Sequence, residues 1–95
     1  MGKLYNEEKV LYFANEEKGL HVSIREEDDT DLSGIVRSLL TRKYIERVAA
    51  DDSGLYYKTT TAGEARLLNL QIQWRERYGK PVTKHKARLK ELQIH

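Results

Sequence analysis

The side chains of this sequence that could do chemistry favour binding over catalysis. The three histidines, His21, His85 and His95, are far apart, and there is no cysteine. The sequence also lacks the H-E-x-x-H zinc motif, a glycine-rich phosphate loop and the G-x-S-x-G nucleophile motif. We therefore expect no enzyme, no metal site and no cofactor. The remaining candidates are positively charged and hydrogen-bonding side chains, which can bind a partner.

Charge is distributed unevenly along the chain, although the net charge is only +2. Residues 1–64 carry nine Lys and Arg against thirteen Asp and Glu, whereas residues 65–95 carry eight against two. Most of the positive excess lies in one block: Arg75, Arg77, Lys80, Lys84, Lys86, Arg88 and Lys90. Such a block can contact nucleic-acid phosphates, or it can be a solvated helix face that docks on the acidic residues 26–31.

Hydrophobic periodicity predicts the elements that must position these charges. It indicates a helix over residues 6–18, a short strand over 20–24, and a loop or exposed helical turn over the charged residues 25–29. A second helix is expected over about 30–43, because five apolar side chains recur there at spacings of 3, 4 and 7. They are Leu32, Ile35, Val36, Leu39 and Leu40.

Turn-forming residues predict a β-hairpin in the middle of the chain. The sequence Asp-Asp-Ser-Gly at 51–54 lies between two segments, 44–48 and 55–59, that contain β-branched and aromatic residues. The two segments are therefore expected to form antiparallel strands joined by this turn.

Two helices are predicted after the hairpin. Thr61 with Glu64 makes a capping box for a long helix, although Thr60 could be the cap instead. Gly79 and Pro81 are placed to end this helix. The residues that follow them predict a basic amphipathic helix.

Two short segments resemble parts of winged helix-turn-helix regulators of the MarR and PadR kind. Residues 39–47, Leu-Leu-Thr-Arg-Lys-Tyr-Ile-Glu-Arg, look like the end of their recognition helix, and residues 57–67, Tyr-Lys-Thr-Thr-Thr-Ala-Gly-Glu-Ala-Arg-Leu, look like the end of their wing. Lys43 and Thr59 stand where the family has Gly and Leu. Lys43 therefore either adopts a left-handed conformation, or the turn differs from that of the family.

The resemblance implies an α+β, mostly helical fold: a winged helix-turn-helix with a two-stranded β-hairpin wing and long carboxyl-terminal helices. Residues 25–29 offer little apolar surface, so the second helix of the motif is expected to be short, distorted or absent. We expect a domain over 1–79 and a basic amphipathic helix over 80–95 that packs on the domain or on a dimer partner. With no apolar run of roughly 18 residues, a cytoplasmic location is expected.

The resemblance also implies a sequence-specific double-stranded DNA-binding protein, a small transcriptional regulator that acts by occupying its site. The helix over 30–43 would enter the major groove. Arg37 is the foremost candidate for a base contact, because Arg can bind guanine through two hydrogen bonds. The predicted DNA-binding residues are Ser33, Gly34, Arg37, Ser38, Thr41, Arg42, Lys43, Arg47 and Lys58.

The acidic tip of the predicted wing, Asp51 and Asp52, favours an alternative function. Two carboxylates near phosphates are repelled, so this tip is expected to stay away from DNA. The alternative is a winged-helix protein–protein interaction module without DNA binding, of the compact kind found in phages and mobile elements.

Leucines and aromatic residues form a stripe on the two carboxyl-terminal helices, which first of all supplies core for a small domain. Because winged-helix regulators commonly pair through their terminal helices, the resemblance implies a homodimer. A two-fold dimer would place two recognition helices on a palindromic site. The residues expected at the dimer interface are Leu67, Leu70, Trp74, Tyr78, Leu89 and Leu92.

Overall fold

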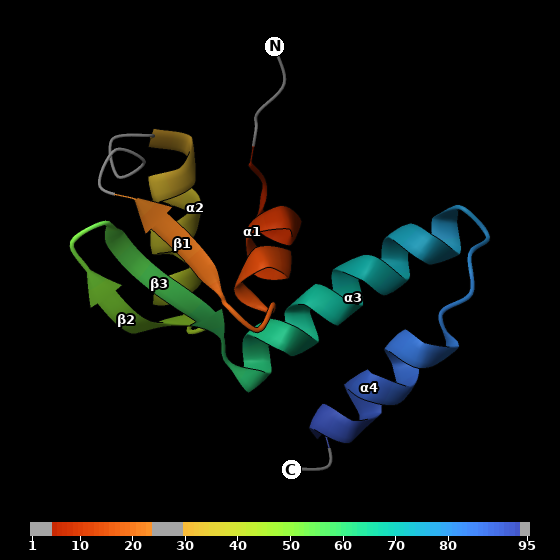
Figure 1. Cartoon of the computed structure of the whole chain (residues 1–95). Coiled ribbons are helices and arrows are strands. Elements are labelled where there is room, and N and C mark those ends of the chain that lie inside the picture. Colours follow the sequence, from red (N-terminus) through yellow and green to blue (C-terminus); the bar gives the residue numbers. More distant parts are fainter. Residues whose placement is uncertain (1–4, 24–29, 94–95) are drawn as a thin grey trace.

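The computed structural model of the chain describes residues 5–23 and 30–93. This part of the chain has an α+β fold, about 57% helical, with one three-stranded antiparallel sheet (Figure 1). The elements are α1 (Glu7–Ala14), β1 (Leu20–Ser23), α2 (Thr30–Thr41), β2 (Ile45–Asp51), β3 (Gly54–Thr59), α3 (Thr61–Arg77) and α4 (Thr83–Gln93). The predicted α+β, mostly helical class is confirmed. The expectations for residues 25–29 lie outside the described residues.

Helix α1 begins at its predicted cap but ends four residues earlier than expected. The Asn6 side chain accepts a hydrogen bond from the backbone N–H of Lys9 at 2.8 Å. Residues 15–18 are polar and exposed, so they offer no apolar side chain that would anchor another turn to the core. Gly19 follows with a φ of 76°, and β1 begins directly after it.

Helix α2 ends at Thr41 in a turn that holds Lys43 in the left-handed region, with a φ of 63°. The backbone N–H of Lys43 donates to the carbonyl of Leu40 at 3.0 Å, and that of Tyr44 donates to the carbonyl of Leu39 at 2.9 Å. This pair of bonds is a Schellman motif, in which the left-handed residue is usually Gly. Lys43 therefore adopts the left-handed conformation, which was one of the two alternatives, and this conformation costs a residue with a Cβ about 1–2 kcal/mol.

The strands pair antiparallel in the order β1–β3–β2, and the predicted hairpin is formed by β2 and β3. At its turn, Asp51 Oδ1 accepts hydrogen bonds from the backbone N–H groups of Ser53 at 2.8 Å and Gly54 at 3.2 Å. The register shifts between Arg47 and Ala49, which makes a β-bulge in β2.

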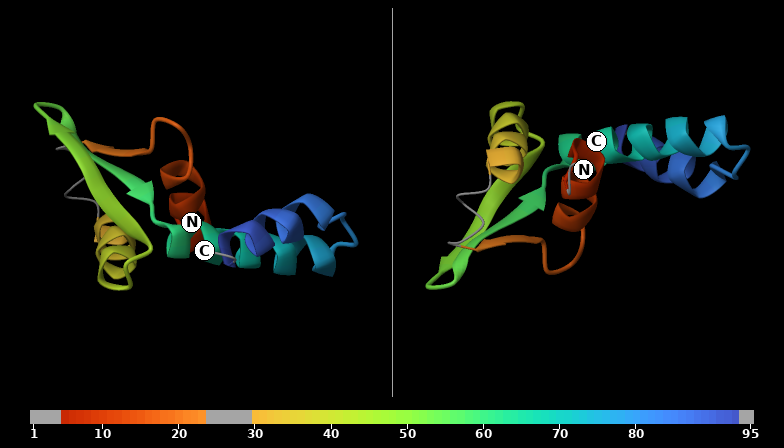
Figure 2. Two further views of the ribbon diagram at one scale, coloured as in Figure 1. Left: turned by 90° about the horizontal axis from the view of Figure 1, so that it is seen from below. Right: turned by 90° about the horizontal axis from the view of Figure 1, so that it is seen from above.

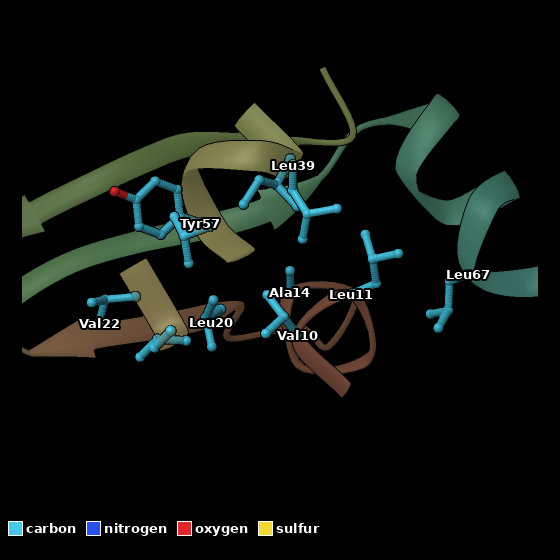
Figure 3. Packing of buried hydrophobic residues seen from close by; sticks show 11 residues of the cluster. Val10, Leu11, Ala14, Leu20, Val22, Leu39, Tyr57 and Leu67 are labelled. Atoms are coloured by element: carbon cyan, nitrogen blue, oxygen red, sulfur yellow. The ribbon is translucent and has the colours of Figure 1, made fainter. Parts of the chain in front are cut away.

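The core lies where α1, α2 and α3 meet the inner face of the sheet (Figure 3). All the described elements except α4 contribute buried side chains to it. These are Val10, Leu11, Ala14, Leu20, Val22, Leu32, Val36, Leu39, Ile45, Tyr57 and Leu67. Because α2 is fixed to this core along one side only, its opposite side is free to carry polar residues.

The first turn of α3 docks against the turn that follows α2. The Thr60 hydroxyl accepts from the N–H of Gly63 at 3.1 Å, so Thr60 and not Thr61 is the cap. The same hydroxyl donates to the carbonyl of Lys43 at 2.7 Å, and the N–H of Thr60 donates to the carbonyl of Tyr44 at 3.0 Å. A Cβ on Gly63 would fall on the Tyr44 carbonyl oxygen, so this close approach requires glycine.

Helices α3 and α4 form a helical hairpin that projects away from the sheet (Figure 2). Gly79, with a φ of 69°, ends the first helix, and α4 runs back along α3. Two hydrogen bonds from the Arg88 guanidinium to the Glu64 carboxylate, at 2.7 and 3.0 Å, join α4 to the start of α3. The basic helix expected over 80–95 therefore packs on α3 of its own chain.

Candidate nucleic-acid interface

Helix α2 presents an exposed polar strip on the side opposite the core. We call Gly34, Arg37, Ser38 and Thr41 the α2 face, because their spacings of 3, 4 and 7 place them together on the helix and all four are exposed. Arg42 and Lys43 continue the exposed surface past the end of α2, whereas Ser33 is half-buried. Most of the residues predicted to bind DNA therefore lie on one continuous strip.

An open pocket of about 190 Å³ lies between one edge of α2 and the inner face of the sheet. Arg37 lies on its α2 side and Leu55 on its β3 side. Leu40 also lines it and is 37% exposed, although the helical spacing assigned Leu40 to the buried face. It stands at the edge of the apolar stripe, where spacing alone does not show how far the sheet extends over the helix. Leu40 is thus a partly exposed apolar neighbour of Arg37 at the edge of the α2 face.

The register of the sheet places the two predicted wing cations on opposite faces. Arg47 pairs with the buried Tyr57 and shares its face, which is the side of the sheet that α2 covers. Lys58 pairs with Glu46, one residue along, and so lies on the outer face. The Lys58 Nζ donates to the carbonyl of Glu17 at 3.1 Å. Arg47 therefore lies on the α2 side of the sheet and Lys58 does not.

Arg42 is held by contacts within the chain. Its Nη1 lies 3.4 Å from Glu7 Oε1, and its guanidinium lies over the ring of Tyr44, 5.2 Å from the centroid. Arg66 Nε donates to the same Glu7 oxygen at 2.9 Å, so one carboxylate joins α1, α3 and the end of α2. The hydrogen bond from Arg66 is the main cause that lowers the pKa of Glu7. Arg42 is therefore less available to a phosphate than Arg37.

We expect Glu7→Gln to destabilise the protein at neutral pH but not in acid. Because the folded-state pKa of Glu7 is lowered, its ion pairs stabilise the fold above the unfolded-state pKa of about 4.3, and this contribution is lost as the pH falls through the folded value. Glu7 is partly exposed, so the loss is about 1 kcal/mol, a decrease in Tm of about 4–8 °C at pH 7.

Thermal unfolding followed by circular dichroism at pH 7 and at about pH 2.5 measures this effect. Glu16→Gln, a change of the same kind at an exposed residue after α1, is the control and should leave the Tm unchanged at both values. A Tm difference for Glu7→Gln that persists in acid would show that its packing, and not its charge, stabilises the fold.

The tip of the hairpin carries a cluster of polar side chains that hold the turn. Asp51 accepts from the Ser53 hydroxyl at 2.6 Å and from the Tyr56 hydroxyl at 2.9 Å, and these bonds, that of Ser53 first, lower the pKa of Asp51 to about 2. His21 Nε2 lies 3.2 Å from the same Ser53 hydroxyl, and its ring stacks on Tyr56 at 4.6 Å. Because the Ser53 proton is donated to Asp51, His21 does not activate this hydroxyl as a nucleophile. The tip is an ionised acidic turn.

The residues expected at a dimer interface fall into two groups. The single chain already covers four of them, wholly or in part: Leu67, Leu70, Leu89 and Leu92. Leu67 is only 2% exposed and lies in the core, so it offers no surface to a second subunit, which corrects the expectation for this residue. Trp74 and Tyr78 are 45% and 61% exposed. The chain therefore covers both ends of the stripe and leaves Trp74 and Tyr78, near the end of α3, exposed.

Comparisons of the chain with protein families, with curated proteins and with solved structures found no match. Within residues 5–23 and 30–93 no helix is long and apolar enough to cross a membrane. The same residues contain no group of three or more His, Cys, Asp or Glu that could hold a metal ion.

Proposed function

We propose that this chain is a winged helix-turn-helix protein that binds double-stranded DNA through α2. The α2 face carries the proposal: a helix anchored along one side offers Arg37, Ser38 and Thr41 on the other, with no carboxylate among them. An α-helix fits the major groove, where Arg binds guanine and the hydroxyls of Ser and Thr reach base edges or phosphates. Site occupancy by such a helix would make the chain a small transcriptional regulator.

Three features of the fold support the winged-helix assignment. The elements follow one another as helix, strand, helix and hairpin, and the strands lie in the order β1–β3–β2. The two segments that carry the family resemblance also contact each other, through Thr60 with Lys43 and Tyr44. In this assignment α2 is the recognition helix and β2–β3 is the wing.

The proposal gives different roles to the cations around α2. Arg37 would contact bases, and Arg47, which lies on the same side of the sheet, would contact the backbone. The ionised Asp51 keeps the tip of the hairpin away from phosphates, so only the first part of β2 would approach the duplex. Lys58 has no part in this surface, because it lies on the outer face, where its ammonium donates to the backbone carbonyl of Glu17.

A winged-helix protein-interaction module is the second candidate. It is favoured by intramolecular contacts of two predicted DNA-binding cations: Arg42 pairs with the Glu7 carboxylate, and Lys58 donates to the backbone carbonyl of Glu17. In a protein that binds duplex DNA, we would expect such cations to contact phosphates instead. The two candidates differ in one measurable property, which is affinity for duplex DNA.

Duplex binding is tested by fluorescence anisotropy after selection of a preferred site from random-sequence DNA. We expect Arg37→Ala to weaken binding to the selected duplex by about 5–100-fold, because it removes a base contact. Arg77→Ala removes the same charge from an exposed position of α3 and is the control, with an expected change of less than about threefold. Absence of binding at low salt, or equal losses in both variants, would reject the recognition-helix role and favour the interaction module.

The homodimer stays a prediction of the sequence. Within one chain only Trp74 and Tyr78 of the expected interface are well exposed. A standard interface buries about 800 Å² on each partner, which is more than two aromatic side chains supply. Size-exclusion chromatography with light scattering measures the mass in solution, which is 11.1 kDa for a monomer and twice that for a dimer.

A further inference from the structure

Two open pockets adjoin along the hairpin of α3 and α4. The first, about 320 Å³ in volume, lies between α1, α3 and α4, and we call it the aromatic pocket after Trp74 in its wall. The second, about 360 Å³ in volume, lies at the start of α4 beside Lys84 and Thr83, and we call it the cationic pocket. Arg75 and His85 line both, so the two pockets are adjacent. Figure 1 shows this hairpin on the opposite side of the molecule from α2.

The Trp74 indole in the aromatic pocket is available to a planar ligand. It is 45% exposed, and the ring of Tyr78 lies beside it at a centroid distance of 4.9 Å. The ammonium of Lys80 lies 4.7 Å from the indole centroid. A cation over an exposed ring is held weakly, and a stacked base binds an aromatic ring more strongly. A base could therefore displace Lys80, whose charge would then be free for a phosphate.

The cationic pocket contains charges that are not neutralised by neighbours. Arg75 is fixed between the two pockets, because its Nε donates to the carbonyl of Pro81 at 2.7 Å. Two cations of α4 form ion pairs within the hairpin: Arg88 pairs with Glu64, and the Nζ of Lys86 lies 3.5 Å from the Glu76 carboxylate. Among the described residues Lys84 has no ion-pair partner. Arg75 and Lys84 together therefore offer positive charge to an anion.

We propose that these adjoining pockets bind single-stranded nucleic acid, with one unpaired base stacked on Trp74 and the adjacent phosphate between Arg75 and Lys84. The carboxylate of Glu8 and the amide of Gln71 also line the aromatic pocket, where they can hydrogen-bond the edge of a base and where Glu8 repels a phosphate. The two pockets thus select base and phosphate separately.

Charge and base exposure favour this ligand over two others. A duplex hides the faces of its bases, so it cannot stack on Trp74. A second copy of the chain that docked on these pockets would bring Arg75 and Lys84 of both chains together, which electrostatic repulsion opposes. Single strands expose both groups that the pockets can hold, and this site is separate from the duplex surface proposed for α2.

Trp74 is the only tryptophan of the sequence, so its fluorescence reports directly on the aromatic pocket. An oligothymidylate of about ten nucleotides is expected to quench it saturably. Heparin, a polyanion without bases, should bind by charge and leave the emission nearly unchanged. Equal quenching by heparin, or none by the oligonucleotide, would overturn the proposal.

Variants separate stacking from charge in anisotropy titrations with the same oligonucleotide, after circular dichroism has shown that they fold. Trp74→Leu should weaken binding about fivefold or more, whereas Trp74→Tyr should restore most of it. Lys84→Gln should reduce the salt dependence by about 0.7 in log–log slope, and the matched Lys86→Gln should not. If Trp74→Leu and Trp74→Tyr lose equal affinity, or the two lysine variants give equal slopes, the proposed contacts are wrong.

Two further measurements keep this proposal distinct from duplex binding and from dimerisation. Arg37→Ala should leave single-strand affinity unchanged, and Trp74→Leu should leave the affinity for the selected duplex unchanged. Loss of both affinities in either variant would contradict two separate sites. A dimer in light scattering that dissociates in Trp74→Leu would show that the pocket is a subunit interface, and the proposal would fail.

Discussion

Gly63→Ala is expected to lower the free energy of unfolding by about 3 kcal/mol or more. The added methyl group would fall on the carbonyl oxygen of Tyr44, which already accepts a hydrogen bond from Thr60. Because the obstacle is backbone, it cannot be relieved by a change of rotamer. The first turn of α3 would have to move away from the end of α2, breaking the bond between Thr60 and Lys43. Denaturation with urea, followed by circular dichroism, measures the loss.

Gly34→Ala is the matched control for this change. Gly34 is also inside a helix, but a Cβ there meets nothing within 4 Å, so alanine should stabilise the protein by about 0.5–1 kcal/mol. The same substitution is thus expected to act in opposite directions at the two positions. If Gly63→Ala were as harmless as Gly34→Ala, the docking of α3 on Tyr44 would be wrong.

The elements that depend on nearby residues could be predicted from the sequence. The cap at Asn6, the hairpin turn at 51–54 and the apolar face of α2 each depend on residues within about two turns of each other. The composition of the α2 face follows from the same spacing, so Arg37 could be proposed as a functional residue before the fold was known. Its apolar neighbour Leu40 could not, because its exposure depends on the extent of the sheet.

Contacts between distant segments could not be predicted in the same way. Glu7 meets Arg66 across 59 positions of sequence, and no local pattern links the two. The face on which Arg47 lies depends on how β2 pairs with β3, which the bulge alters within the strand. The pockets of the hairpin depend on where α4 packs, and its sequence shows only that it is basic and amphipathic. Pairing and packing therefore decide which of the predicted cations share a surface.

Leu39→Ala is expected to lower the free energy of unfolding by about 2–5 kcal/mol, and the Tm by about 8–40 °C. The side chain of Leu39 is fully buried beneath α2, so its removal leaves a cavity at the contact that anchors this helix to the core. Domains of this size are stable by about 5–15 kcal/mol, so the loss is a large fraction of the total. Differential scanning calorimetry measures both quantities.

Leu40→Ala provides the matched comparison, because it removes the same atoms from the next residue of the helix. Leu40 is 37% exposed and lines the pocket beside Arg37, so its loss should cost less than about 1 kcal/mol of stability. If the α2 face meets a duplex, Leu40→Ala should weaken that binding, since an apolar side chain there can contact a thymine methyl group. Leu39→Ala, measured well below its Tm, should retain it. Equal destabilisation by the two variants would mean that α2 is rotated about its axis, and the residues assigned to the α2 face, Arg37 among them, would then be wrong.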